Sequence, residues 1–349
     1  MKFGNFLFPE SREADRDSAV IDETLAEARL SDELGLESLW LAEHHFDGNC
    51  AYVDPVTFAA AIAVATRRIR IGFAVAQVSL HHPIRLAEQL ALIDNLSHGR
   101  LIVGLGRGTA HNIYEYLGYG IDPEEAQERL LEAEEVMLAA WQGRDYEHDG
   151  KYWRLRLPLL RPRPYSRPHP PIIRACSGEE SMLAEARAGR PFLMNVQSNE
   201  VTRRRLQAYR QAMRGAGHDE ATVAKCAEEC WIWRNVFVAE TDAEAERIGL
   251  PAFREQAAHR AKMRLRTYEE LGLSMHRGPA APAASRNQAA HALICGSPAT
   301  VVERIAEIAT LGAGGMIMSF RLGPMTHEQA CNSLRLFMAR VAPEFAKAA

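Results

Sequence analysis

The sequence predicts an α/β fold, a (β/α)8 TIM barrel with insertions. Three observations predict it. Short apolar segments bounded by polar residues recur eight times, most intervals between them show helical spacing, and 349 residues accommodate one barrel with insertions. We therefore expect a single domain over residues 1–349. The expected strands cover residues 3–8, 38–43, 69–76, 101–105, 171–176, 192–196, 230–238 and 315–320.

The helices between these strands are indicated by apolar stripes and by residues typical of helix ends. Stripes over residues 20–34, 86–96 and 130–140 each stop at or near a glycine, which commonly ends a helix. Another helix is expected to begin at Ser297-Pro298, because serine caps a helix and proline suits its first turn. The alternative fold, an open doubly wound sheet, would have a glycine fingerprint after its first strand, and this chain has none there.

Two insertions interrupt the alternation. Residues 142–170 contain five prolines and several arginines, which predicts an ordered surface excursion with extended pieces. Residues 272–297 include an alanine- and proline-rich stretch, and loops of this length inside a barrel are commonly lids, so we expect a mobile lid there. The charged helix expected at residues 254–270 is interpreted as a solvated face.

Composition argues against several classes of protein. A formal net charge of −4 argues against nucleic acid as the main partner, and no apolar run reaches membrane-spanning length. The N-terminal region lacks the features of a signal or transit peptide. Six scattered cysteines in a chain with a large core favour reduced thiols in a cytoplasmic protein. Cys226 and Cys230 lack a second pair at ligand spacing, so we expect no metal site.

The segment Ser38-Leu-Trp-Leu-Ala-Glu-His-His-Phe46 is the most informative of the chain. An apolar strand ends there in Glu43, His44 and His45, at the edge where α/β proteins place their chemistry. Histidine both accepts and donates protons near neutral pH, which indicates an acid–base role. The alternative interpretation is a hydrogen-bonded, partly buried histidine pair.

Two further strand ends carry groups that bind anions. Arg107 stands between Gly106 and Gly108, where backbone amides and a cation can meet a phosphate; the alternative is an ion pair in a tight turn. After the fifth strand, the small polar loop from Ser177 through Ser181 opens a helix, which suits either a phosphate or an ordinary N-cap. Together these ends indicate a phosphorylated cofactor without naming it.

Several motifs resemble those of one family. They are Met1-Lys-Phe-Gly-Asn-Phe-Leu7, Trp40-Leu-Ala-Glu-His-His-Phe46, Leu80-His-His-Pro83, Ser97-His-Gly-Arg100 and Gly106-Arg-Gly108. In this order they resemble the bacterial luciferase-like flavin monooxygenases, and most closely the luciferase α subunit. The similarity extends over nearly the whole chain and is densest through about residue 130.

The resemblance implies a luciferase-like barrel that binds reduced FMN at the carboxyl ends of its strands. His44 matches the family's catalytic histidine. Independently of the resemblance, we expect Glu43 or a neighbour to fix the tautomer of this imidazole. The remaining matches are flavin-binding positions: a cis peptide between Ala74 and Val75 against the ring, Arg107 and Arg129 at the phosphate, Ser177, Gly178 and Ser181 at the phosphate-binding helix start, and Asn195 at the sixth strand.

The main hypothesis is therefore a two-component monooxygenase. A separate flavin reductase would supply reduced FMN, dioxygen would be the co-substrate, and His44 would act as acid and base on a small organic substrate. The resemblance also implies a homodimer that pairs through outer helices. The chain departs from the luciferase α subunit at Gly106, at Ser177-Gly178 and in the composition of the lid, which leaves light emission and aldehyde preference open.

Three other hypotheses stay open. A deazaflavin-dependent oxidoreductase would keep the fold, and a non-catalytic flavin-binding partner subunit would resemble the luciferase β chain. A metal-dependent hydrolase would use His44 and His45 as ligands. Adjacent strand residues point to opposite faces of a sheet, which disfavours this last hypothesis.

Overall fold

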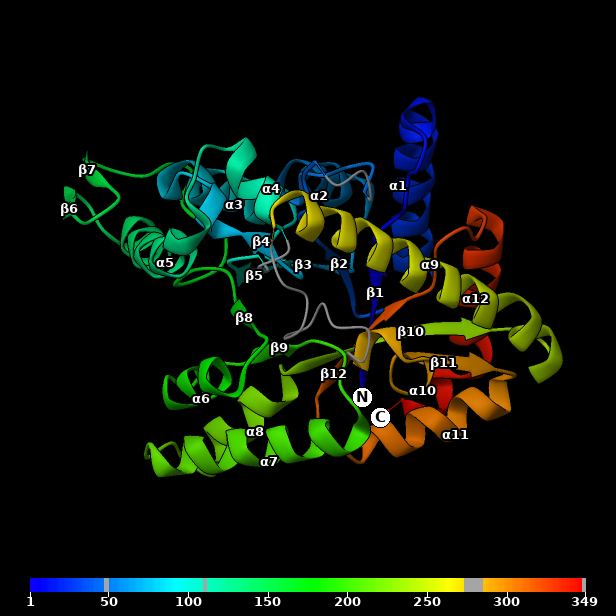
Figure 1. Cartoon of the computed structure of the whole chain (residues 1–349). Helices are drawn as coiled ribbons and strands as arrows, with labels where there is room; N and C mark the ends of the chain where they lie inside the picture. The colour runs from blue at the N-terminus through cyan, green and yellow to red at the C-terminus, as the bar shows by residue number, and fades with distance from the viewer. Residues whose placement is uncertain (47–49, 109–111, 273–284, 347–349) are drawn as a thin grey trace.

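The structure, a computed structural model, describes residues 1–46, 50–108, 112–272 and 285–346. Eight parallel strands close into a barrel, because β10 hydrogen-bonds to both β9 and β12 and so joins the two ends of the strand order. Figure 1 shows the helices on the outside of this sheet. In barrel order the strands are β1 (Lys2–Leu7), β2 (Ser38–Leu41), β3 (Arg70–Phe73) with its continuation β4 (Ala76–Gln77), β5 (Leu101–Gly106), β8 (Ile172–Cys176), β9 (Phe192–Met194), β10 (Trp231–Val238) and β12 (Gly315–Ser319).

The helices begin and end at the residues that favour such ends. Asp54 caps α2, accepting from the backbone N–H groups of Val56 at 2.9 Å and Thr57 at 3.1 Å, and α1 is followed by Gly35 with a φ of +83°. The longer helices are α1 (Asp17–Glu33), α2 (Pro55–Ala65), α3 (Pro83–Leu96), α5 (Ala126–Gln142), α6 (Glu179–Arg187), α7 (Asn199–Gly215), α8 (Glu220–Glu228), α9 (Asp242–Glu270), α11 (Pro298–Ala309) and α12 (His327–Arg340). None of the helices in the described ranges is long and apolar enough to cross a membrane.

Two tryptophans fill the centre of the barrel. Trp40 of β2 and Trp231 of β10 are fully buried, and their ring centroids are 5.1 Å apart. Glycines on the neighbouring strands make room for Trp40, since a Cβ added at Gly4 or Gly72 would lie 2.6 Å from its indole. Alternation of large and small residues across strands therefore gives a packed core below the cavity described next.

The eight expected strands are all present, which confirms the predicted barrel. The proline-rich excursion contains an antiparallel hairpin, β6 (Tyr146–Asp149) with β7 (Arg154–Leu157), in line with the extended pieces expected there. Of the expected lid, residues 273–284 lie outside the described residues. The rest of it is η4 (Ser285–Asn287), α10 (Ala289–Ala292) and β11 (Leu293–Gly296), a strand that the sequence did not predict and that pairs with the outer half of β10.

Candidate active site

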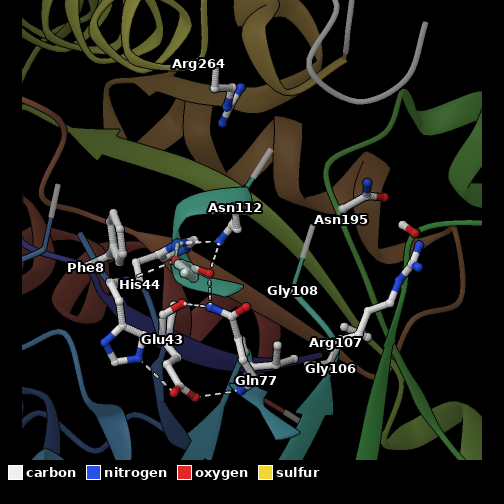
Figure 2. A pocket seen from close by; sticks show the side chains of 18 of the residues that line it. Phe8, Glu43, His44, Gln77, Gly106, Arg107, Gly108, Asn112, Asn195 and Arg264 are labelled. Carbon is white, nitrogen blue, oxygen red and sulfur yellow. Dashed lines mark hydrogen bonds and ion pairs between the residues drawn. The ribbon is translucent and has the colours of Figure 1, made fainter. Parts of the chain in front are cut away.

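A cavity of about 950 Å³ opens at the carboxyl ends of the barrel strands. Its floor is formed by residues that follow β2, β3, β5, β8 and β9, and its opposite wall is formed by α9 and by α4 (Ile113–Gly118). Figure 2 shows His44, Glu43, Gln77 and Asn112 gathered on one side, with Arg107 and Asn195 on the other. This position is the one that barrel enzymes use for their chemistry.

His44 is held through one of its two ring nitrogens. Its Nδ1 lies 3.3 Å from Glu115 Oε1 and 3.2 Å from Asn112 Nδ2, and its ring packs edge-on against Phe8 with centroids 5.2 Å apart. Asn112 Nδ2 is a donor that already bonds Glu115 at 2.6 Å, whereas the carboxylate only accepts, so the contact with Glu115 favours a proton on Nδ1. Nε2 is then the nitrogen that can exchange a proton with a bound molecule.

Glu115 lines the cavity and contacts His44, and sequence reasoning missed it. It is buried on α4, where it accepts from the backbone N–H of His45 at 3.0 Å, from Asn112 Nδ2 at 2.6 Å and from Gln77 Nε2 at 2.5 Å. The expectation was that Glu43 or a neighbour fixes the tautomer of His44. The structure shows Glu115 in contact with His44, while Glu43 contacts other histidines.

Glu43 is the centre of a second buried network. Its Oε1 accepts from His45 Nε2 at 2.9 Å and from His81 Nε2 at 2.8 Å, and its Oε2 accepts from the backbone N–H of Gln77 at 2.6 Å. Burial alone would raise the pKa of Glu43, but these hydrogen bonds and the charge of His81 lower it to about 2. Burial would lower the pKa of His81, and the bond and charge of Glu43 outweigh it and raise that pKa.

Arg107, Ser177 and Ser181 all line the cavity, from the neighbouring strand ends of β5 and β8 and the first turn of α6. Guanidinium and hydroxyl groups at a helix start are a suitable donor set for a phosphate. Arg205 of α7 donates to the carbonyl of Ser177 at 3.4 Å but does not itself line the cavity. Arg174 lines the cavity too, but it forms ion pairs with Glu134 and Glu185.

The strand ends that lie between the His44 side and the Arg107 side of the cavity carry small side chains. The peptide between Ala74 and Val75 is cis, as the resemblance implied, and both residues line the cavity. A Cβ added at Gly106 would lie 2.4 Å from Val75 Cγ2, so glycine leaves room for that valine. Beside them, Gln77 Oε1 is buried and has no hydrogen-bond partner among the described residues. Within those residues no three His, Cys, Asp or Glu side chains gather to hold a metal ion.

The chain matches the luciferase-like monooxygenases over residues 1–314. It belongs to that family. The oxygenase component of a flavin-dependent trigonelline monooxygenase from Acinetobacter baylyi is 32% identical over 174 residues, 49% of this chain and 48% of that one. An alkanal monooxygenase alpha chain from Photorhabdus luminescens is 26% identical over 229 residues, 65% and 62% of the two chains. The chain thus spans about half to two thirds of the length of these relatives.

The solved structures agree with this assignment. The monooxygenase RslO1 from Streptomyces bottropensis superposes with a TM-score of 0.82 at 29% sequence identity, and the match covers 99% of this chain and 100% of that one. The predicted luciferase-like barrel and the family resemblance are both confirmed.

Most residues predicted for the site line this cavity: His44, Ala74, Val75, Arg107, Ser177, Ser181 and Asn195. Gly178 stands at the N-cap of α6 between two lining serines but is not itself part of the wall. Arg129 is not brought to the wall. Its Nε donates to Glu125 at 2.8 Å and its guanidinium lies 4.6 Å from the ring centre of Tyr152, so its role as a flavin ligand stays a prediction.

Proposed function

We propose that this luciferase-like monooxygenase uses reduced FMN, delivered by a separate flavin reductase, and dioxygen to oxidise a small organic molecule. The observation that carries the proposal is that one cavity is lined both by His44 and by the phosphate-suited set of Arg107, Ser177 and Ser181. The related trigonelline monooxygenase is flavin-dependent and is named as an oxygenase component, which supports a flavin and a separate reductase.

The residues of the wall fit a flavin. Gln77 Oε1 is a buried acceptor with no partner among the described residues, and an isoalloxazine ring carries N–H groups that would satisfy it. Ala74, Val75 and Gly106 would lie along the ring, while Arg107, Ser177 and Ser181 would bind the phosphate, with Asn195 nearby in the wall. Reduced flavin, when bound, supplies the electrons that activate dioxygen.

The protein itself would position the flavin and the substrate, exclude water and move protons. Glu115, which accepts a hydrogen bond from Asn112 Nδ2, holds His44 by its Nδ1, and this leaves Nε2 for proton exchange with a molecule in the cavity. General acid–base catalysis by one positioned group contributes about 10²–10⁴-fold. The aromatic side chains of Phe6 and Phe8 shield this side of the cavity from water.

We also propose that the protein is a cytoplasmic homodimer. All six cysteines are free, which suits a reducing compartment. Apolar side chains are exposed on two neighbouring outer helices: Val64 of α2 is 69% exposed, and Leu92 and Leu96 of α3 are 50% and 38% exposed. Leu92 and Leu96 are four residues apart and share one helix face, which favours burial against a partner.

The proposed function is tested by cofactor binding. Arg107→Gln should raise the Kd of FMN about 10- to 100-fold, because a charge-assisted hydrogen bond contributes about 1.5–3 kcal/mol. Isothermal titration calorimetry with oxidised and anaerobically reduced FMN measures this. The matched control is Arg156→Gln, at an exposed arginine of β7 that does not line the cavity. An unchanged Kd in R107Q would contradict the phosphate assignment.

The same titration separates the alternatives. Tighter binding of an 8-hydroxy-5-deazaflavin than of FMN would favour the deazaflavin oxidoreductase, and uptake of neither would overturn the proposed function. His44→Asn should keep the FMN affinity and slow reoxidation of the bound reduced flavin by dioxygen, measured by stopped flow. Normal reoxidation in H44N together with normal substrate oxidation would exclude His44 as the acid–base group.

A further inference from the structure

The cavity has a second cationic wall, apart from Arg107. Four arginines line it from above the strand ends: Arg260, Arg264 and Arg266 of α9, and Arg286 of η4. Figure 2 shows Arg264 reaching toward the cavity from the side opposite Gly106 and Arg107. The charged half of α9 was interpreted from sequence as a solvated face, and the structure corrects that interpretation, because part of this half faces the cavity.

The charges of this wall are predominantly positive. Arg260 and Arg12 share the buried carboxylate of Glu10, each at 3.2 Å, and Arg266 pairs with Glu270 at 2.7 Å. Burial, with the nearby charge of Arg260 adding to it, lowers the pKa of Arg286 to about 10. An anion entering here would therefore meet a favourable potential.

The arginine wall lies close to His44. The ring of Phe8 links the two, with its centre 5.2 Å from the His44 ring centre and 5.2 Å from Arg260 Cζ. Trp233 also lines the cavity beside Arg260 and Arg264, and its buried indole N–H has no hydrogen-bond partner among the described residues. Phe8 therefore contacts both the arginine wall and the proposed acid–base group, and Trp233 adds an N–H donor beside the arginines.

We propose that the molecule oxidised in this cavity has an apolar body and a carboxylate, and that Arg264 and Arg286 bind the carboxylate. This inference rests on the proposed function, since it assigns the substrate class of that same site. Arginine suits the role because its planar donors match the two carboxylate oxygens. The phosphate of the cofactor would lie at Arg107, across the cavity, so the two anions would occupy different ends.

The test uses probes that share a shape and differ in charge. Benzoate is compared with benzamide, and 1-anilinonaphthalene-8-sulfonate with N-phenyl-1-naphthylamine, by calorimetry and fluorescence on the full chain with and without saturating FMN. We expect each anion to bind at least tenfold more tightly than its neutral partner. Arg264→Gln should reduce anion affinity about 10- to 100-fold. Arg264→Lys should reduce anion affinity less, because lysine keeps the positive charge.

Arg254→Gln is the matched control, since Arg254 is an exposed arginine of the same helix and does not line the cavity. It should leave anion binding unchanged. Equal affinity for the charged and neutral probes would overturn the inference. An R264Q variant with reduced affinity for FMN and unchanged affinity for the anion would also overturn it. Anion binding that survives in R107Q while FMN binding is lost would support it and would separate it from the proposed function. Circular dichroism verifies that each variant is folded.

Discussion

The orientation of His44 depends on Glu115. Glu115 is buried and contacts both the His44 ring and the N–H of the next residue, so it holds the side chain and the backbone at this strand end. Glu115→Gln should lower the rate of substrate oxidation about 10- to 100-fold, because a charge-assisted hydrogen bond of about 1.5–3 kcal/mol is lost.

A change in the pH–rate profile of E115Q distinguishes this positioning role from a structural one. Glu115→Asp should recover part of the rate, and FMN affinity should stay close to that of the original protein. An E115Q variant with an unchanged profile and rate would show that His44 does not need the carboxylate. Stopped-flow kinetics between pH 5 and pH 9 measure both quantities.

Which residues line the cavity was predictable from sequence where a strand end and a motif coincide. His44 and Arg107 follow strands directly, and the geometry of a parallel barrel brings such ends together. Glu115 was not predictable, because it lies on a six-residue helix, 71 residues along the chain from His44, and only the folded structure brings the two together. Arg129 has the expected residue type, but local partners Glu125 and Tyr152 hold its side chain away from the wall.

At the scale of elements, the Glu43–His81 pair joins the end of β2 to η2 (Val78–Leu80) and makes stability depend on pH. The pKa of Glu43 is lower in the folded protein than in the unfolded chain, where it is near 4.3. Ionised Glu43 therefore stabilises the fold at pH values above about 4.3, and this contribution is lost as the pH falls toward about 2. The raised pKa of His81 stabilises the fold fully below about 6.5, and this is lost as the pH rises through its folded value.

His81→Gln should therefore destabilise the protein most between about pH 5 and pH 6.5, and progressively less at alkaline pH. Urea unfolding at a series of pH values measures the difference from the original protein. His82→Gln, at the exposed neighbouring histidine, is the control and should show no such trend. A constant difference between H81Q and the original protein at all pH values would contradict the ion-pair explanation.

Gly104 of β5 lies in close contact with β3, so a substitution at Gly104 tests how tightly these strands pack. A Cβ at Gly104 would lie 1.6 Å from the carbonyl oxygen of Phe73, which is backbone and cannot rotate away. Gly104→Ala should lower the free energy of unfolding by about 3 kcal/mol or more, the upper end of overpacking costs. Gly215→Ala, with nothing within 4 Å of its added Cβ, should be neutral or slightly stabilising. Denaturant unfolding measures both, and equal stability of the two variants would exclude the steric explanation.

The barrel was predictable because its strands are apolar runs with polar ends, a pattern that survives without tertiary context. β11 was not, because it is four residues long and follows an alanine-rich stretch without strand character. It becomes a strand because the outer half of β10, from Asn235 to Val238, offers a free edge beyond the point where the barrel closes.

At the scale of the whole molecule, the arginines of α9 show what sequence periodicity does not reveal. Their spacing suits a solvated face, and only barrel closure places a cavity beneath Arg260 and Arg264. The same limit applies to the outer surface, where exposure of an apolar residue is known only from the fold. The exposure of Val64, Leu92 and Leu96 in the folded structure therefore bears on how subunits assemble, and the sequence does not reveal it.

A homodimer through α2 and α3 predicts that charge on this face separates the subunits. Val64→Asp with Leu92→Asp should weaken dimerisation at least a hundredfold, since burial of each apolar side chain contributes about 1.5–3 kcal/mol and each new carboxylate opposes burial. Sedimentation velocity over a range of concentrations measures this. Leu265→Asp is the control, at an exposed leucine of α9, and should remain dimeric. A monomeric original protein would contradict the homodimer, and a dimer that survives the double substitution would place the interface elsewhere.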